Sequence, residues 1–325
     1  AYLVWLIVPP VLNWALLDAN WSGSTRADCS GEGACWVFVR ERFGQFMYGF
    51  FPEGLRWRVN LTVLLAVAGA APLFIQRMPR KAVYAAGFLL LYPLLAFWLL
   101  HGGFFALEEV PTSRWGGLML TLVIAAVGIA GALPLGILLA LGRRSDLPAI
   151  RVLCVTFIEF WRGVPLITVL FMSSVMLPLF LPEGLSFDKL VRALIGVILF
   201  QSAYIAEVVR GGLQAIPKGQ YEAAAAMGLG YWRMMGLVIL PQALKLVIPG
   251  IVNTFIALFK DTSLVIIIGL FDLLNSIKQA TADPAWIGMA TEGYVFAALL
   301  FWMFCFGMSR YSMRLERRLD TGHKR

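Results

Sequence analysis

The chain has 325 residues, of which 60% are apolar and 14% charged, and its mean hydropathy is +0.78. A soluble domain carries about 25% charged residues, so this composition excludes a soluble enzyme, a disordered chain and a disulfide-stapled secreted domain. We expect an all-α, polytopic membrane protein. The net charge is +8, but the sequence shows no basic face and no aromatic RNA-binding pattern. We therefore expect the chain to contact membrane lipid and not to bind nucleic acid. The first residue is Ala1, so we expect an upstream segment to be missing.

Long apolar runs predict about eight transmembrane helices, because about 20 apolar residues cross a bilayer. A further apolar stretch, 255–274, is interrupted by Lys260 and Asp261. It either continues the seventh span or forms a separate broken or re-entrant segment. The predicted spans are 1–17, 59–75, 82–100, 116–141, 152–181, 190–210, 237–258 and 293–311.

Basic residues on the short connections predict the orientation. They favour the side that holds both termini, so we place the N- and C-termini in the cytoplasm and the long loop 18–58 outside. Cys29 and Cys35 lie in this loop, and an oxidising compartment there favours a disulfide between them. Cys154 and Cys305 lie in apolar runs, as small buried hydrophobic residues do.

The long loop also carries an amphipathic pattern. Apolar residues three and four apart predict a helix with one apolar face. This helix either lies in the membrane interface or packs on the protein's own outer face, and the sequence favours neither. The residues of that face are Trp36, Val39, Phe43, Met47 and Phe50.

Small residues repeat every fourth position in the fourth span, at Gly128, Ala132, Gly136 and Ala140. They predict a groove along one helix face that another helix can approach closely. The pattern is architectural and carries no information about a substrate.

Enzymatic signatures are missing from the sequence. It contains no GxxxxGK[ST] phosphate loop, no HExxH and no paired CxxC, and its histidines are His101 and His323. His101 stands at a span end, where an interfacial histidine is the ordinary explanation. We therefore expect neither catalysis nor a bound cofactor in this chain.

The segment between spans six and seven predicts a helix–turn–helix on the inner face. GQYEAAAAMGLG contains Glu222, Ala223 and Ala224 in a strong helix former, which Gly228 then breaks. The next span begins around VILP, which ends with Leu240 and Pro241. Small alanines allow another protein to dock closely, and Glu222 is expected near the helix N-terminus, where its charge suits the dipole.

This spacing resembles the EAA loop, E-A-A-x3-G-x9-I-x-L-P, of ATP-binding-cassette (ABC) importer permeases, with Val238 at the isoleucine position. Three more stretches are similar to permeases for polar amino acids: TFIEFWRGVPLITVLF, AYIAEVVRGGLQAIPKGQYEAA and FKDTSLVIIIG. Departures at Val164 and at Thr168–Val169 leave the fine substrate specificity open. The three extra N-terminal spans resemble the large permease of general L-amino-acid importers of the Aap and Bzt type.

The resemblance implies a domain plan and a set of partners. Residues 1–111 would form the N-terminal spans with the loop 18–58, residues 112–319 a five-span permease core with the coupling loop at about 215–241, and 320–325 a cytoplasmic tail. The partners would be a homologous second permease, two ATPase subunits that bind ATP and Mg²⁺, and a periplasmic amino-acid-binding protein. The membrane would be the bacterial inner membrane, and the chain would alternate between outward- and inward-open forms.

Charged residues within the spans are costly and indicate function. Glu159 and Arg162 share a helix face, and Glu207 and Arg210 repeat that spacing. A zwitterionic amino acid needs a cation and an acceptor, so such a pair suits a substrate path. We favour the other explanation, in which the pairs are mutual salt bridges that hold the spans together or close an inner gate. Lys260–Asp261 is open to the same two interpretations. Gly163 and Pro165 follow Arg162 and are expected to loosen the helix.

Other classes of protein would leave different signatures. A self-sufficient secondary transporter would show an inverted repeat and would not need an EAA loop. A membrane enzyme would show a catalytic or metal-binding cluster. A permease for another small polar solute is the alternative within the same family.

Overall fold

The computed structural model describes residues 8–29, 31–75, 79–103, 107–180, 182 and 187–319. The helical fold is as predicted: in these ranges six helices are long and apolar enough to cross a membrane, and a bent pair is a seventh candidate. The chain forms two compact units, 1–122 with 269–302, and 123–268 with 303–325. These units interleave along the sequence, so neither coincides with the regions 1–111 and 112–319.

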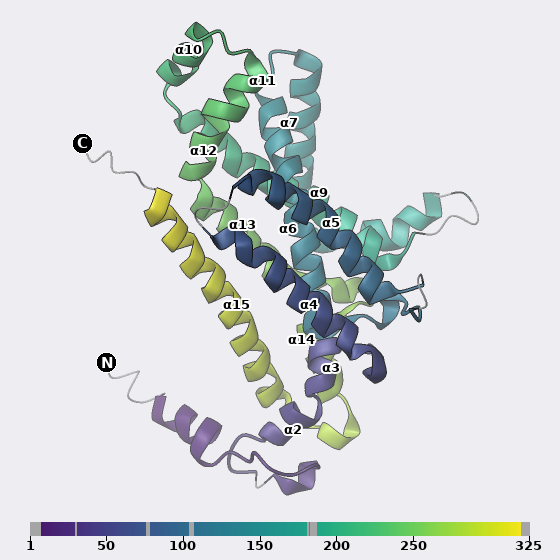
Figure 1. Cartoon of the computed structure of the whole chain (residues 1–325). Coiled ribbons are helices and arrows are strands. Elements are labelled where there is room, and N and C mark those ends of the chain that lie inside the picture. The colour runs from purple at the N-terminus through teal and green to yellow at the C-terminus, as the bar shows by residue number, and fades with distance from the viewer. Residues whose placement is uncertain are drawn as a thin grey trace. The chain divides into compact units, whose positions relative to one another are not determined.

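The first unit holds several short helices and two long hairpin helices (Figure 1). Its single described strand, β1 (Phe271–Asp272), bridges Gly116 and Gly117 in a parallel sense. Its elements are η1 (Asn13–Leu17), η2 (Arg26–Asp28), α2 (Trp36–Glu41), α3 (Phe43–Tyr48), η3 (Glu53–Leu55), α4 (Arg56–Ala70), η4 (Ala71–Phe74), α5 (Lys81–His101), η5 (Thr112–Arg114), α14 (Leu273–Thr281) and η10 (Pro284–Trp286).

The second unit contains the helices that carry the predicted site. Two long helices begin in one unit and end in the other, namely α6 (Gly117–Arg143) and α15 (Ala290–Leu319). The rest are α7 (Pro148–Gly163), α8 (Leu166–Phe171), η6 (Met172–Met176), η7 (Leu177–Phe180), α9 (Lys189–Ala215), α10 (Lys218–Ala226), α11 (Tyr231–Met234), η8 (Met235–Ile239), α12 (Leu240–Leu246), α13 (Ile248–Asp261) and η9 (Thr262–Ile268).

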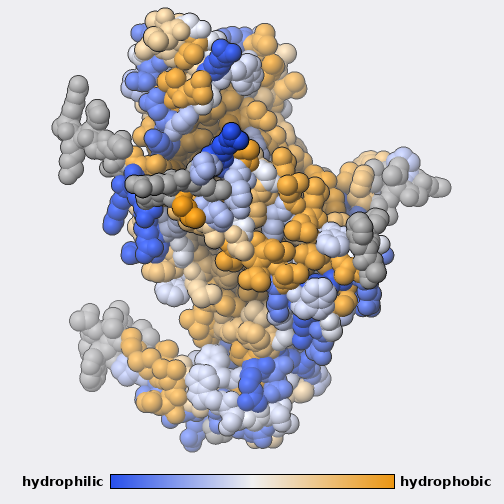
Figure 2. Space-filling model, in the orientation of Figure 1, coloured by the Kyte–Doolittle hydropathy of each residue, from blue (hydrophilic) through white to orange (hydrophobic). Residues whose placement is uncertain are grey.

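Most predicted spans match a helix, and hydrophobic residues cover broad areas of the visible face in Figure 2, as lipid-facing helices require. The first predicted span is described in part only. Residues 1–7 lie outside the described ranges, and Val8–Leu17 forms a shorter apolar helix.

The prediction of one continuous span at 152–181 is wrong. Pro148–Gly163 and Leu166–Phe180 are bent by 102° at the break between them. Val164 is extended, with φ −108° and ψ 134°, as expected for the residue before Pro165. Proline also lacks the N–H that would continue the helix. The sequence predicted the loosening by Gly163 and Pro165 but not the size of the bend.

The predicted bounds of the seventh span, 237–258, are also wrong. The spanning helix is Ile248–Ile268, because Val247 leaves the helical region before Pro249 and separates it from α12. The stretch after Phe255 therefore continues this span: Lys260 and Asp261 end α13, and the 3-10 helix η9 follows directly.

The amphipathic segment of the long loop packs on the protein. It forms two helices, because Arg42 leaves the helical region and shifts the phase between α2 and α3. The predicted apolar face is right in part: Val39 is buried and Trp36 and Met47 pack against the core, but Phe43 and Phe50 are exposed. Phe38 and Phe46, which the predicted face did not include, are fully buried. Their neighbours in the core of the first unit include Val37, Leu273, Ile277, Trp286 and Ala297.

The stripe of small residues on α6 lies against neighbouring helices of the second unit. A Cβ atom at Gly136 would stand 2.6 Å from Ile205 and 2.9 Å from the carbonyl oxygen of Ser202, both on α9. A Cβ atom at Gly128 would stand 3.0 Å from Leu258 on α13 and 3.1 Å from Val197 on α9. Close helix approach is the use that the pattern predicted.

Candidate coupling and transport site

Five charged side chains from α6, α7 and α9 form one cluster in the second unit. The Nη1 atom of Arg143, the last residue of α6, lies 2.6 Å from Glu207 Oε1 and 2.9 Å from Glu159 Oε1. Arg210 Nη2 lies 2.9 Å from Glu207 Oε2. Arg162 Nη1 is held more loosely, 3.7 Å from Glu207 and 3.8 Å from Glu159. Three cations therefore share two carboxylates.

The sequence predicted two separate pairs and missed the residue that joins them. Glu159 and Arg162 lie on α7, and Glu207 and Arg210 lie on α9, each pair at the expected i,i+3 spacing. The joining residue is Arg143, which follows the predicted span 116–141 by two residues. Its position at the C-terminal end of α6 is the available signal, since a cation there suits the helix dipole.

The cluster lies beside the bend at residues 163–166, and its loosest member has an aromatic neighbour. The guanidinium carbon of Arg162 lies 6.0 Å from the centroid of the Tyr204 ring, within the range of a cation–π contact. Lys260 and Asp261 do not join this group, and in the described part of the chain neither makes an ion pair within 4.0 Å. The same ranges hold no set of three His, Cys, Asp or Glu side chains that suits a metal ion.

The EAA segment folds as a helix, a turn and a second helix. Gly228 adopts φ +76°, which favours glycine. Its N–H donates to the carbonyl of Ala225, and the N–H of Leu229 donates to the carbonyl of Ala224. These two bonds form a Schellman motif that ends α10. The predicted helix break at Gly228 therefore has a specific backbone geometry.

The expected position of Glu222 near the helix N-terminus is wrong. The helix α10 begins at Lys218 and has no acidic residue in its first turn. The N-cap of α10 is Pro217, which is extended, with φ −58° and ψ 141°. Ile216 is extended as well, as expected for the residue before a proline. Glu222 therefore lies in the middle of α10, exposed, and gains little from the dipole, which acts within the first turn.

The turn between α10 and α11 and the two helices that follow it, α11 and η8, have exposed apolar residues. Met227 is 81% exposed, and Trp232 and Leu237 are each 70% exposed. In contrast, Ala224 is buried, so α10 packs inward through this alanine. In Figure 1, α10 and α11 form one end of the second unit, close to the beginning of α7.

The second arm of the segment is part of the core. Met235 and Ile239 are buried among Val209 and Leu213 of α9 and other apolar residues. Val238 is half-buried, and its carbonyl accepts a 2.8 Å bond from Gln242, whose amide also reaches Gln220 on α10 at 3.2 Å. Leu240 begins α12, and Pro241 stands in its first turn, where a missing N–H costs nothing.

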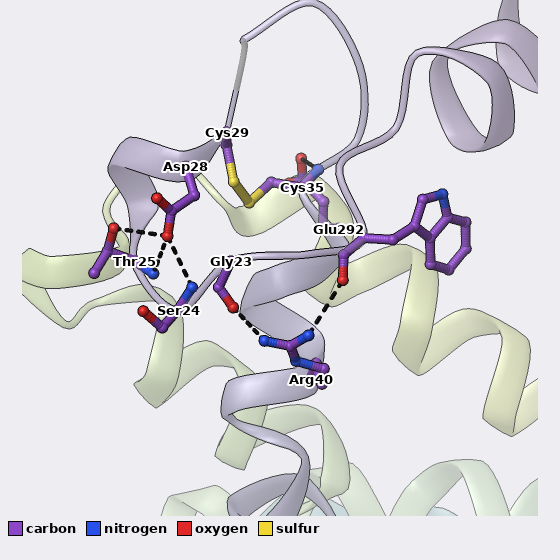
Figure 3. Close-up of a disulfide and its surroundings, with 9 residues drawn as sticks. Gly23, Ser24, Thr25, Asp28, Cys29, Cys35, Arg40 and Glu292 are labelled. Carbon is purple, nitrogen blue, oxygen red and sulfur yellow. Dashed lines mark hydrogen bonds between the residues drawn. A yellow bond between two sulfur atoms is a disulfide. The ribbon is translucent and has the colours of Figure 1, made fainter.

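Cys29 and Cys35 are joined by a disulfide in the first unit (Figure 3). The backbone N–H of Cys35 donates a 3.1 Å bond to the buried carboxylate of Glu292, the first-turn acid of α15. Nearby, Asp28 accepts bonds from the backbone N–H groups of Ser24 and Thr25, and these bonds lower the pKa of the Asp28 carboxyl. The loop around Cys29 and Cys35 is therefore held by the disulfide and by hydrogen bonds to its backbone.

An apolar helical bundle, a charged cluster and an exposed helix–turn–helix together define a membrane transport subunit. The family model for binding-protein-dependent transport system inner membrane components matches residues 132–321. The chain belongs to this family.

Relatives resemble the chain over its whole length. It is 70% identical over 321 residues to the inner membrane amino-acid ABC transporter permease protein YhdY of Escherichia coli K12, covering 99% of this chain and 88% of the relative. It is 42% identical to the glutamate/glutamine/aspartate/asparagine transport system permease protein BztC of Rhodobacter capsulatus, covering 99% and 89%. A solved amino acid ABC transporter with histidines matches with a TM-score of 0.55 and 28% identity over 62% of this chain and 92% of that one.

Proposed function

We propose that this chain is a permease subunit that carries L-amino acids into the cytoplasm, driven by ATP hydrolysis in separate subunits. The exposed α10–α11 segment carries the coupling half of this proposal. It combines uncovered apolar residues, Met227 and Trp232, with an exposed carboxylate, Glu222, on a helix that is fastened to α9 and α12. A surface of this kind suits docking to another protein.

The substrate half rests on the relatives and on the charged cluster. The two relatives above are named for amino-acid transport, and the matched solved structure is of an amino acid transporter. A zwitterion needs a cation and an acceptor, and the cluster offers both. Arg162 is its loosest cation, at 3.7 and 3.8 Å from the carboxylates. It is therefore the one most able to exchange its partners for a substrate carboxylate or to open a gate.

The partners and the orientation complete the proposal. A second, homologous permease, two ATPase subunits with ATP and Mg²⁺, and a periplasmic binding protein would assemble around this chain in the inner membrane. Both termini and α10 would face the cytoplasm, since basic residues favour that side. The permease core at 112–319 would hold the path, and 1–111 would be an addition to it.

The test is ATP-driven uptake of labelled L-amino acids by proteoliposomes that contain the complete complex. The charge reversal Glu222→Lys should lower uptake about tenfold, because it opposes the contact with the ATPase surface. Glu316→Lys, a matched reversal at the exposed end of α15, should leave uptake unchanged. Normal uptake with Glu222→Lys would reject the coupling role of this loop, and a wild-type complex without amino-acid uptake would reject the function itself.

A further inference from the structure

Two consecutive arginines at the end of α6 hold the neighbouring helix α9 at two levels. Arg143 bonds to Glu207, as described above. Arg144, the next residue, donates from Nη1 to the carbonyl oxygen of Leu213 at 2.9 Å. Glu207 and Leu213 are six residues apart, which is about 9 Å along an α-helix. The end of α6 is therefore tied to α9 by a charged contact and, further on, by a backbone contact.

The Leu213 carbonyl is also where α10 is attached. Because α9 ends at Ala215, this carbonyl is among the last four of the helix, which have no partner within it. It accepts a second bond, of 3.1 Å, from the hydroxyl of Tyr221 on α10. Arg144 Nη1 in turn donates to that hydroxyl at 3.1 Å, and its guanidinium carbon lies 5.5 Å from the Tyr221 ring centroid. One oxygen atom thus joins the ends of α6 and α9 to α10.

We propose that Arg144 is the positioning residue that passes movement of α10 to α6 and α9, through the shared carbonyl of Leu213 and its partner Tyr221. This inference rests on the proposed function and names a residue outside the EAA segment. A push on α10 displaces Tyr221, and Arg144 carries the displacement to the end of α6. Arg143, bonded to Glu159 on α7 and Glu207 on α9, then receives it directly.

The contacts within the EAA segment alone do not connect α10 to α6. The Gln220–Gln242 bond fastens α10 to α12 within the same segment, so it cannot by itself reach α6. Arg144 supplies the contact across helices that are distant in the sequence. Its donors are in a fixed planar fork, so the direction of the contact is defined as well as its length.

The experiment measures amino-acid uptake per ATP hydrolysed in proteoliposomes of the full complex. Arg144→Gln should lower this ratio about tenfold, because it removes a charged donor from a helix end. Tyr221→Phe, which keeps the ring, should lower it about threefold, since one neutral bond is lost. The double variant should have the same uptake per ATP as Arg144→Gln alone, because both residues act in the same link.

The control is Arg151→Gln. Arg151 is exposed and its Nε donates to the Ser145 carbonyl, so it lies in the same connection, and among the described residues it makes no hydrogen bond or ion pair to α10. Its ratio should stay within about twofold of wild type. If Arg144→Gln does not assemble, Tyr221→Phe decides the question, since it removes a single oxygen atom.

A merely structural role would give a different result. Assembly, thermal stability and total ATP hydrolysis would fall together, while uptake per ATP stayed at the wild-type value, and that outcome overturns the proposal. Strictly additive losses in the double variant would also overturn it. Loss of uptake in the wild-type complex is a separate failure, because it concerns the proposed function and is measured before any variant.

Discussion

Arg143 lies between two carboxylates, and this position changes how the cluster around it responds to mutation. Glu207 is its least exposed member, with a side chain that is 16% exposed, and three arginines lie within 4.0 Å of it. Removing Glu207 would leave three cations with one carboxylate. Glu159, in contrast, contacts two arginines, Arg143 and Arg162. Removing Glu159 and Arg162 together leaves two cations with one carboxylate, which is the same net charge as that of the whole cluster. The two carboxylates are therefore not equivalent.

The first prediction separates a salt bridge from a substrate contact at Arg162. Glu159→Gln and Arg162→Gln should each lower uptake about fivefold, because each single change alters the net charge of the cluster. The double change restores that net charge and should recover most of the uptake. Both side chains are partly exposed, so the single losses should be modest. The measurement is uptake at equal amounts of assembled complex.

A direct substrate contact predicts the opposite pattern. If Arg162 binds the substrate carboxylate, the double variant lacks the required cation and its uptake stays low. Arg162→Lys should then also transport poorly, since a point charge does not reproduce a bidentate fork. Persistent loss in the double variant would therefore reject the salt-bridge interpretation.

The second prediction at this scale concerns Cys29 and Cys35. Native protein without reductant should leave both thiols unlabelled by a maleimide, and reduced protein should label both. A link across six residues stabilises a fold by about 2 kcal/mol, so Cys29→Ser with Cys35→Ser should lower the melting temperature in detergent. Labelling of either cysteine in the unreduced protein would show that the bond does not form in the membrane.

Among the elements, the sequence predicted those that depend on hydrophobic runs or on local signals. Long apolar stretches indicated the spans, and Gly228 indicated the end of α10. The size of a bend and the contacts between helices were harder to predict from the sequence, because contacts depend on partners elsewhere in the chain. Pro165 indicated a break but not the 102° bend, and the break at Arg42 had no signal in the apolar pattern. The contacts of Arg143 are with α7 and α9, which its own segment does not describe.

The third prediction tests the close approach of α6 to its neighbours. Gly136→Ala should destabilise the protein by about 1–3 kcal/mol, because its Cβ atom would meet the backbone oxygen of Ser202 as well as Ile205. Gly128→Ala should cost less, since its nearest neighbours are side-chain methyl groups at 3.0 and 3.1 Å and no backbone atom. Melting of the purified protein, followed by fluorescence, ranks the variants.

A matched control for this series is Gly307→Ala on α15. Beyond the neighbouring turns of α15 itself, no atom of the described residues lies within 4 Å of the added Cβ, and alanine is the better helix former, so stability should hold or rise slightly. Equal melting temperatures for Gly136→Ala and Gly307→Ala would contradict the packing that the structure assigns to α6.

At the scale of the whole molecule, the chain passes between its two compact units three times. The first unit is built from the beginning of the chain and from 269–302, with 123–268 in between. Its core joins Phe38 and Phe46 to Leu273, Ile277 and Ala297. Contacts of such long sequence separation form slowly, since the intervening chain must be closed into a loop.

During synthesis, the core of the first unit therefore forms only after its last residues have been made. At 5–20 residues per second, about 10 to 45 s pass between the appearance of Phe46 and that of Leu273. During this time the apolar faces of α2 and α3 lack the partners that α14 and α15 supply, while the six-residue disulfide link can close at once. A nascent chain arrested after Ile268 should be cut readily by protease within α2–α3, and one arrested after Leu319 should resist, so the last third of the chain protects the first.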